Sequence, residues 1–255
     1  GIGRFGMGMK TAALSMSPVM ELYSWQEPQA YYCMTLDVEA IGKDRANLVE
    51  LPEPTLQPDL TDEVVELFTK PMSWPSDRSD QEVFAPDARQ FYDLLGQHGT
   101  IVYMPGCDRL TSRPLAEHAT SEMARIYRRS IAKGVRLYIN NRRVEAFDPT
   151  YSMIDARHAR FLDGVTTHSR LHLSRSIDIK LSDRDRSLTA PIIVKIFRLP
   201  IEEWSSLPRK TLKNDLRVFD DLTVSILRND RELFAGALPA WASRDRVTHC
   251  DRIQI

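Results

Sequence analysis

The first eleven residues, GIGRFGMGMKT, combine four glycines with a lysine and a threonine. The glycines allow positive φ angles and close approach of the backbone, so that successive N–H groups can converge on a phosphate. A helix beginning near Lys10 would add its positive N-terminal dipole, and the Lys10 side chain would add a full charge. The segment therefore predicts a loop that binds an anion.

Two known phosphate loops fit this segment poorly. Gly1-x-Gly3-x-x-Gly6 matches the dinucleotide fingerprint, but that motif requires a preceding strand and an acidic residue about 20 positions on. Glu21 is near that distance, yet it lies at the start of a predicted strand. The P-loop pattern fails because Met9 precedes Lys10. A Rossmann-type oxidoreductase is thus the least favoured function, and a glycine-rich turn without a ligand is the structural alternative.

The composition excludes several classes of protein. The chain has 255 residues, 42% hydrophobic and 27% charged, which is typical of a globular protein with one large or two medium domains. Its net charge of −1 excludes a uniformly basic nucleic-acid binder. Cys33, Cys107 and Cys250 form no CxxC pair, which argues against a disulfide framework or zinc ribbon. No apolar run reaches the ~20 residues of a membrane span, so we expect a cytoplasmic protein.

The periodicity of the chain predicts an α+β fold. Helices are expected at 10–17, 62–69, 87–95, 115–133 and 208–218. The longest of these carries Leu115, Ala119, Met123, Ile126 and Ser130 as one stripe facing a sheet. Strands are expected at 19–25, 31–41, 101–104, 135–139, 143–147, 171–181, 190–199, 223–227 and 232–235. Asn140-Asn141 and residues 228–231 should form hairpin turns.

The chain divides into two expected modules. Residues 1–149 form the first, which includes a proline-rich insertion at 51–90 and ends with a strand and a long helix. Asp148-Pro149 marks the boundary, and residues 150–255 form the second module. We expect mixed or antiparallel sheets in both.

The segment IGRFGMGMKTA resembles the second glycine box of the GHKL superfamily, which includes gyrase B, the ninety-kilodalton heat-shock chaperones, MutL, MORC ATPases and histidine kinases. In that family the box has the pattern Gly-x-x-Gly-x-Gly-hydrophobic and forms the lid over the ATP triphosphate. Here it corresponds to Gly3, Gly6, Gly8 and Met9, followed by Lys10. Gly99-Thr100, about 90 residues later, resembles the Gly-Thr that opens a late strand of the family's sheet near the adenine.

The resemblance implies an ATP-binding switch. It implies a partial Bergerat-type α/β sandwich in residues 1–149 and a transducer-like, ribosomal S5-like domain in 150–255. It also implies that Mg²⁺ binds together with ATP, that the lid closes when the nucleotide binds, and that the protein forms a homodimer. The residues expected to bind ATP are Gly3, Arg4, Phe5, Gly6, Met7, Gly8, Met9, Lys10 and Thr100.

The catalytic residues of the family have no counterpart in this sequence. Its general-base Glu, its magnesium-binding Asn and its Asp-x-Gly box all lie upstream of the glycine box, so we expect them upstream of Gly1. Hydrolysis of ATP is therefore expected of a full-length protein that carries them. In the family a basic transducer residue reports the γ-phosphate, and the candidates for this role are Lys195, Arg228 and Arg231. A solvated hairpin tip is the alternative interpretation of the two arginines.

A basic segment suggests a second function. Residues 109–143 hold nine Lys or Arg against Glu117 and Glu122. Such a stripe could neutralise nucleic-acid phosphates, which would make the protein an ATP-gated DNA or RNA clamp. The candidate contacts are Arg125, Arg128, Arg129, Lys133 and Arg136. The alternatives are an amphipathic helix with a solvated basic back, and a chaperone-like or scaffold protein that binds polypeptides through the proline-rich insertion.

Overall fold

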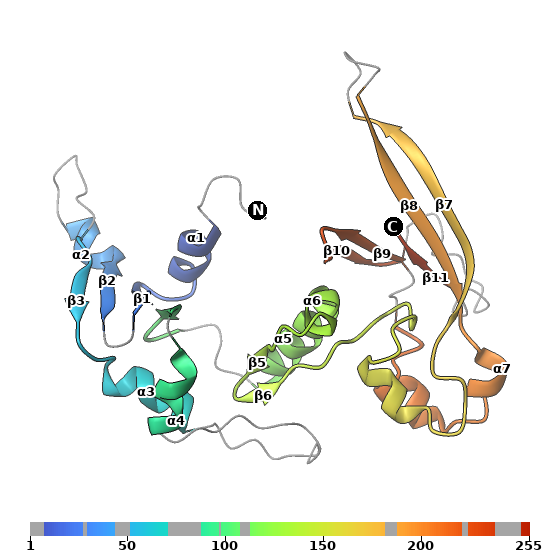
Figure 1. Ribbon diagram of the computed structural model, residues 1–255, viewed down its shortest axis with the longest axis horizontal. Coiled ribbons are helices and arrows are strands. Elements are labelled where there is room, and N and C mark those ends of the chain that lie inside the picture. Colours follow the sequence, from blue (N-terminus) through green and yellow to red (C-terminus); the bar gives the residue numbers. More distant parts are fainter. Residues whose placement is uncertain are drawn as a thin grey trace. The chain divides into compact units, whose positions relative to one another are not determined.

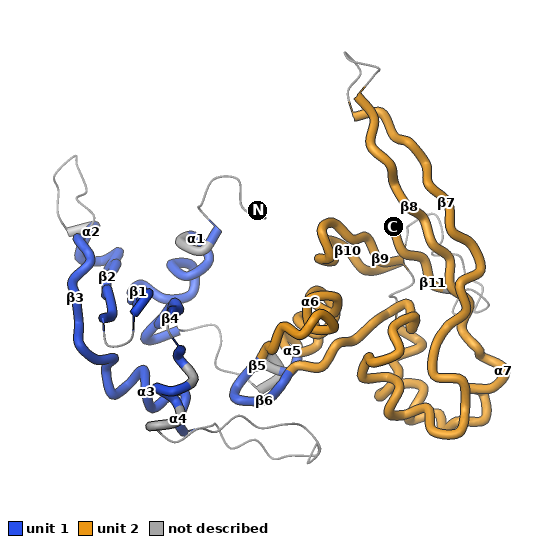
Figure 2. Tube along the Cα trace, viewed as in Figure 1, with its two compact units in different colours: residues 1–117, 138–143 blue, residues 118–137, 144–255 orange. Residues whose placement is uncertain are grey.

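The computed structural model describes residues 8–27, 30–43, 52–70, 88–96, 98–107, 113–181, 188–220, 224–237 and 251–255. These residues form two compact units, coloured separately in Figure 2. Unit 1 comprises residues 1–117 and 138–143, and unit 2 comprises 118–137 and 144–255. Both contain helices and sheets, which confirms the α+β class. The boundary expected at 149 falls inside unit 2, because residues 118–133, which are nearly all of the expected long helix, also belong to that unit.

The sheet of unit 1 is antiparallel, with strand order β3-β2-β1-β4 (Figure 1). Its strands are β1 (Val19–Trp25), β2 (Tyr31–Asp37), β3 (Thr55–Gln57) and β4 (Gly99–Tyr103). The central pairing places Leu22 of β1 between Met34 of β2 and Val102 of β4. Strand β4, although it follows β1 by more than seventy residues, thus lies directly beside it.

The two faces of this sheet carry separate cores. Tyr23 and Trp25 lie on one face and pack with Leu60, Val64 and Phe91 beneath the helices α3 (Asp62–Thr69) and α4 (Ala88–Leu95). On the other face, Ala13 of α1 (Gly8–Leu14) packs against Met20 and Leu36. Alternation of side chains along β1 and β2 produces this division, because successive residues point to opposite faces.

The strand expected at 31–41 is too long. β2 ends at Asp37, and the helix α2 (Val38–Lys43) follows at once. The Asp37 carboxylate accepts hydrogen bonds from the backbone N–H groups of Glu39 and Ala40, at 2.9 and 3.0 Å. Asp37 therefore caps the helix, and capping outweighs the alternation that continues through residue 40.

The turn predicted at Asn140-Asn141 is confirmed. Both residues have positive φ, 48° and 62°, as a two-residue hairpin turn requires. The strands on either side are shorter than expected and comprise β5 (Tyr138–Ile139) and β6 (Arg142–Arg143). The Asn141 side-chain amide also donates to the Phe68 carbonyl at 2.9 Å, which ties this hairpin to the end of α3.

The long helix expected at 115–133 is divided into α5 (Arg113–Ile126) and α6 (Arg128–Ala132). The break falls at Tyr127, whose φ and ψ of −102° and 13° leave the helical region. Among residues 117–132, whose side chains the structure describes, the buried ones are Ala124, Arg125 and Arg128. Ala119, Met123, Ile126 and Ser130 of the expected apolar stripe are only half-buried.

Unit 2 contains a five-stranded mixed sheet with order β10-β9-β11-β8-β7. β7 (Arg170–Lys180) and β8 (Thr189–Arg198) form a long antiparallel hairpin whose far part extends beyond the other strands of the unit (Figure 1). β11 (Asp251–Gln254) pairs antiparallel with β8 and parallel with β9 (Val224–Arg228). β9 and β10 (Arg231–Gly236) form a second hairpin around Asn229 and Asp230, both with positive φ.

A separate core lies beneath this sheet. Tyr151, Leu162, Trp204, Leu216 and Val218 are buried together with the short helices η1 (Arg157–Phe161), α7 (Ile201–Trp204) and η2 (Thr211–Asp215). The Tyr151 hydroxyl donates to the Leu216 carbonyl. The helix expected at 208–218 is shorter in the structure, where residues 209–215 are helical and the last five of them form the π-type turn η2.

Candidate nucleotide-binding site

The glycine motif lies only partly within the described residues. Gly3, Arg4, Phe5, Gly6 and Met7 lie outside them. Gly8, Met9 and Lys10 form the first turn of α1, which therefore begins two residues before the expected start. Nothing lies within 4 Å of a Cβ built on Gly8, and this helix has no acidic residue in its first turn. The motif thus runs directly into the helix that covers part of the unit 1 sheet.

Thr100 lies on the same face of the sheet as α1. The register opposes Thr100 of β4 to Ser24 of β1, and Ser24 to Tyr32 of β2. The Ser24 and Thr100 hydroxyl oxygens are 3.4 Å apart. Thr100 is exposed, Tyr32 is 55% exposed, and Leu22 beside them is half-buried. This end of the face is not covered by α1, so it offers two hydroxyls and apolar side chains to a ligand.

The structure explains why residue 99 is a glycine. A Cβ built on Gly99 would lie 2.4 Å from Cζ2 and 2.6 Å from Cη2 of Trp25, a side chain that is 4% exposed. Only a residue without a side chain lets β4 approach this indole ring. The glycine places Thr100 beside Ser24 because it brings the two strands together at this point.

The opposite face of the sheet holds the acidic groups of this region. The Tyr23 hydroxyl donates to Glu21 at 2.8 Å, and the Tyr103 hydroxyl donates to Glu63 at 3.1 Å. Burial, followed by the hydrogen bond to Glu21, raises the pKa of Tyr23, so it remains a neutral donor. These carboxylates thus lie on the face of the sheet away from Thr100.

Two of the expected nucleic-acid contacts are buried. Arg128 is 0% exposed and donates to Glu232 at 2.9 Å and to the Ser225 hydroxyl at 2.8 Å. Arg125, 8% exposed, is paired with Glu232 and with Glu122. Since both guanidinium groups are satisfied inside unit 2, neither reaches a surface where a nucleic-acid phosphate could bind. The expectation for Arg125 and Arg128 is corrected on this ground.

Asp148 completes this buried network. Its Oδ1 lies 3.4 Å from Nε of Arg128, and its carboxylate accepts hydrogen bonds from the backbone N–H groups and hydroxyls of Thr150 and Ser152. Burial alone would raise the pKa of Asp148, but the charge of Arg128 and these hydrogen bonds outweigh it and lower that pKa. The carboxylate is therefore ionised and holds the chain at the position where a domain boundary was expected.

A buried histidine makes the stability of unit 2 depend on pH. Burial lowers the pKa of His158, and the negative charge of Asp148 offsets this only in part. Because the folded state resists protonation, its stability is fully present above the unfolded pKa of about 6.5 and is lost as pH falls through the folded pKa. We expect the free energy of unfolding, measured with urea, to fall between pH 7 and pH 5.

The variant His158→Phe tests the source of this pH dependence. Phenylalanine retains the aromatic edge contact with Tyr151, whose ring centroid lies 5.2 Å from that of His158. The variant should show a flatter dependence, whereas His172→Gln, at an exposed position on β7, should retain the wild-type slope. An unchanged slope in His158→Phe would refute the assignment.

The remaining basic candidates lie in unit 2. Arg129 and Lys133 both bond Asp230, and Arg136 is exposed after α6. Lys195 is half-buried on β8, opposite Ser174 and Gln254. Arg228 and Arg231 end and begin the strands of the β9–β10 hairpin, so the structure brings them together with the α6 cations. None of these residues belongs to the unit that holds the glycine motif.

The described part of the chain contains neither a metal-binding cluster nor a helix suited to a membrane. No group of three or more histidine, cysteine or acidic side chains there is arranged to hold a metal ion. Among the same residues, no helix combines the length and apolar character needed to cross a membrane.

The beginning of the chain is similar to a family of known proteins. Residues 1–67 are similar to the family described as histidine kinase-, DNA gyrase B-, and HSP90-like ATPases. The match covers about a quarter of the chain and includes the glycine motif, α1, β1 and β2. Neither a curated protein nor a solved structure matches the chain significantly.

Proposed function

We propose that the chain binds ATP through unit 1, with the similarity of residues 1–67 to GHKL-type ATPases as the premise. One structural observation supports this proposal most directly. The glycine motif runs into α1, and the part of the sheet face that α1 leaves uncovered carries Ser24 and Thr100. A phosphate loop and a partly apolar face with hydroxyls are the two requirements of a nucleotide site.

In this proposal different residues contact different parts of ATP. The backbone of Gly3, Gly6 and Gly8 and the Lys10 ammonium bind the phosphates, which also carry Mg²⁺. Thr100, supported by Ser24 3.4 Å away, bonds the adenine end. The half-buried Leu22 provides an apolar surface to the base.

The second part of the proposal is that ATP acts as a switch. Closure of the glycine loop would promote dimerisation, and unit 2 would act as transducer, with Lys195 as the residue that responds to the γ-phosphate. What supports this part is the order of the chain, in which the segment similar to GHKL-type ATPases is followed by a second unit of helices and strands.

Isothermal titration of the chain with ATP and Mg²⁺ tests the binding proposal. We expect Thr100→Val to weaken binding by roughly 3–10-fold, the effect of one hydrogen bond of about 1 kcal/mol. Lys10→Ala should weaken it by about tenfold or more, since it removes a charge-assisted contact. The matched control is Thr189→Val, at an exposed position on β8 of unit 2, which should leave the affinity unchanged. Equal affinities for all four proteins would contradict the assigned site.

A further inference from the structure

Four cations lie near the turn of the β9–β10 hairpin, and two of them contact the carboxylate at this turn. Arg129 and Lys133 come from α6 and its C-terminal end, and Arg228 and Arg231 come from the two strands. The carboxylate is that of Asp230. We call these five residues the hairpin-tip cluster, which has a net charge of +3.

Asp230 neutralises only part of this charge. Its Oδ1 lies 3.3 Å from Arg129, and its Oδ2 lies 2.5 Å from Lys133. The hydrogen bonds from Lys133 and then Arg129 lower the pKa of Asp230, so it is ionised and shared between two cations. In the part of the chain that the structure describes, no carboxylate pairs with Arg228 or Arg231.

The pairing of Arg228 with Arg231 lowers the stability of the hairpin, so stability does not explain why both residues are arginine. They lie directly opposite each other at the end of the hairpin, where like charges destabilise a pair of strands. The Arg231 guanidinium lies 5.6 Å from the centroid of the Tyr127 ring, which holds its position. Its Nε is buried without a hydrogen-bond partner. Such locally unfavourable choices are typical of functional sites.

The position of the cluster favours an extended anion. Lys133 is 68% exposed in its side chain and Arg228 is also exposed, so two of its four cations are solvated. Exposed cations distributed over a helix end and a hairpin turn are typical of contacts to a nucleic-acid backbone.

We propose that the hairpin-tip cluster binds the phosphodiester backbone of a nucleic acid, with Arg228 and Arg231 as its direct contacts and Asp230 as the group that limits its affinity. The site is built entirely from unit 2 and does not depend on the proposed ATP site in unit 1. Because its contacts are to phosphate, binding depends on salt and not on base sequence.

The variant Asp230→Asn gives the sharpest test, because the proposal predicts a gain. Asparagine has nearly the shape of aspartate and also tolerates the positive φ of 62° at this position. Removing the carboxylate releases Arg129 and Lys133 for phosphate. We expect binding to a fluorescent duplex of about 20 base pairs, measured by anisotropy, to tighten by roughly 2–5-fold.

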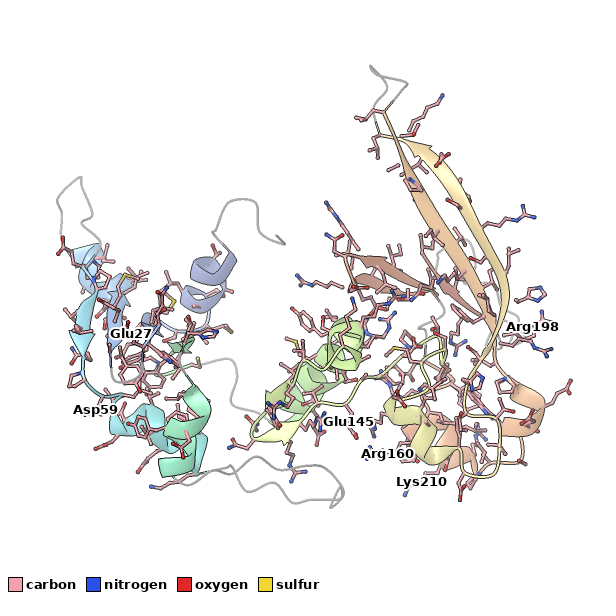
Figure 3. The ribbon with its side chains drawn as sticks, in the orientation of Figure 1. Glu27, Asp59, Glu145, Arg160, Arg198 and Lys210 are labelled. Atoms are coloured by element: carbon pink, nitrogen blue, oxygen red, sulfur yellow. The ribbon has the colours of Figure 1, made fainter. Side chains whose placement is uncertain are left out.

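Variants that remove a positive charge from the cluster should weaken duplex binding. Arg228→Ala should weaken duplex binding by about 3–10-fold and reduce the slope of log K against log salt by about 0.9, the value for one lost phosphate contact. The matched control is the double variant Arg209→Ala/Lys210→Ala, which removes two exposed cations elsewhere in unit 2 (Lys210 is labelled in Figure 3). It should change the affinity by less than about twofold.

Three results would overturn the proposal. The first is no duplex or single-strand binding by the wild type at about 50 mM salt. The second is a loss of affinity in Asp230→Asn, which would show that Asp230 has only a structural role. The third is that ATP displaces the duplex from the wild type but not from Arg228→Ala. This result would show that the cluster binds a nucleotide. Failure of ATP titration alone would leave this proposal standing, so the two proposals fail separately.

Discussion

Replacing Arg128 by alanine is expected to destabilise unit 2 by about 3–5 kcal/mol, the cost of removing one partner from a buried ion pair. The Arg128 guanidinium contacts both Glu232, 3% exposed, and Asp148, 1% exposed. Without it, Asp148 would depend on its hydroxyl and backbone donors, and Glu232 would retain only Arg125 and Ser225. Urea unfolding followed by circular dichroism measures this free energy.

The neighbouring Arg129→Ala is the matched control. It removes the same group from the next position of α6, but the Arg129 side chain is 37% exposed and its ionic partner Asp230 is 38% exposed. Its other partner is the neutral Gln254 side chain, to which it donates a hydrogen bond at 3.0 Å. Exposed ion pairs contribute at most about 1 kcal/mol. The double variant Arg128→Met/Glu232→Leu should lose less stability than the two single variants added together, because each single variant already removes the Arg128–Glu232 pair. Equal costs for Arg128→Ala and Arg129→Ala would show that burial has been assigned wrongly.

The second large effect is expected from Gly99→Ala. A methyl group at 2.4–2.6 Å from the Trp25 ring must displace either the indole or the β4 backbone. Trp25 contacts Tyr31 edge-to-face at 5.5 Å between ring centroids and is packed among the aromatic core of unit 1, so it has little room to move. Overpacking of this kind costs about 1–3 kcal/mol.

The same substitution should also weaken nucleotide binding, because displacement of β4 moves Thr100 away from Ser24. Thermal unfolding and ATP titration of Gly99→Ala measure the two effects. Gly8→Ala is the control for stability, since no atom lies within 4 Å of the added methyl group. A Gly99→Ala protein as stable as Gly8→Ala would mean that the ring adapts to the methyl group, and the proposed reason for this glycine would be wrong.

Local signals predicted several of the strands and both hairpin turns. The alternation of residues 19–25 and 171–181 corresponds to β1 and β7, whose bounds are Val19–Trp25 and Arg170–Lys180. Asparagine and aspartate tolerate positive φ, which places turns at Asn140-Asn141 and Asn229-Asp230. Asp37 is also a local signal for a helix, because it directly precedes the helix that it caps. The alternation of polar and apolar residues around it favoured a longer strand instead.

Long-range pairing could not be predicted in the same way. Arg125 and Arg128 are indistinguishable by sequence from the exposed basic residues around them, because their partner Glu232 is separated from them by 107 and 104 residues. Helical periodicity alone places an arginine on a solvated face, and only the opposing carboxylate makes its burial favourable. The predicted nucleic-acid surface therefore included two residues of the core.

The candidate nucleotide site was predicted in its types of residue but not in its geometry. Glycine spacing and the Gly-Thr dipeptide identified the two segments. The sequence does not show that Ser24 opposes Thr100, or that Gly99 faces an indole ring, because both follow from the pairing of β1 with β4. Most of the glycine motif lies outside the described residues.

The short β5–β6 hairpin has a consequence for proteolysis. Residues 138–143 belong to unit 1, although the segments before and after them belong to unit 2. The chain therefore passes between the units three times, and neither unit is encoded by one uninterrupted segment. A protease that cuts once near residue 117 would leave the larger fragment carrying a hairpin of unit 1, held there by the hydrogen bond from Asn141 to Phe68. Such fragments would remain associated after the cut, as in a complementing pair.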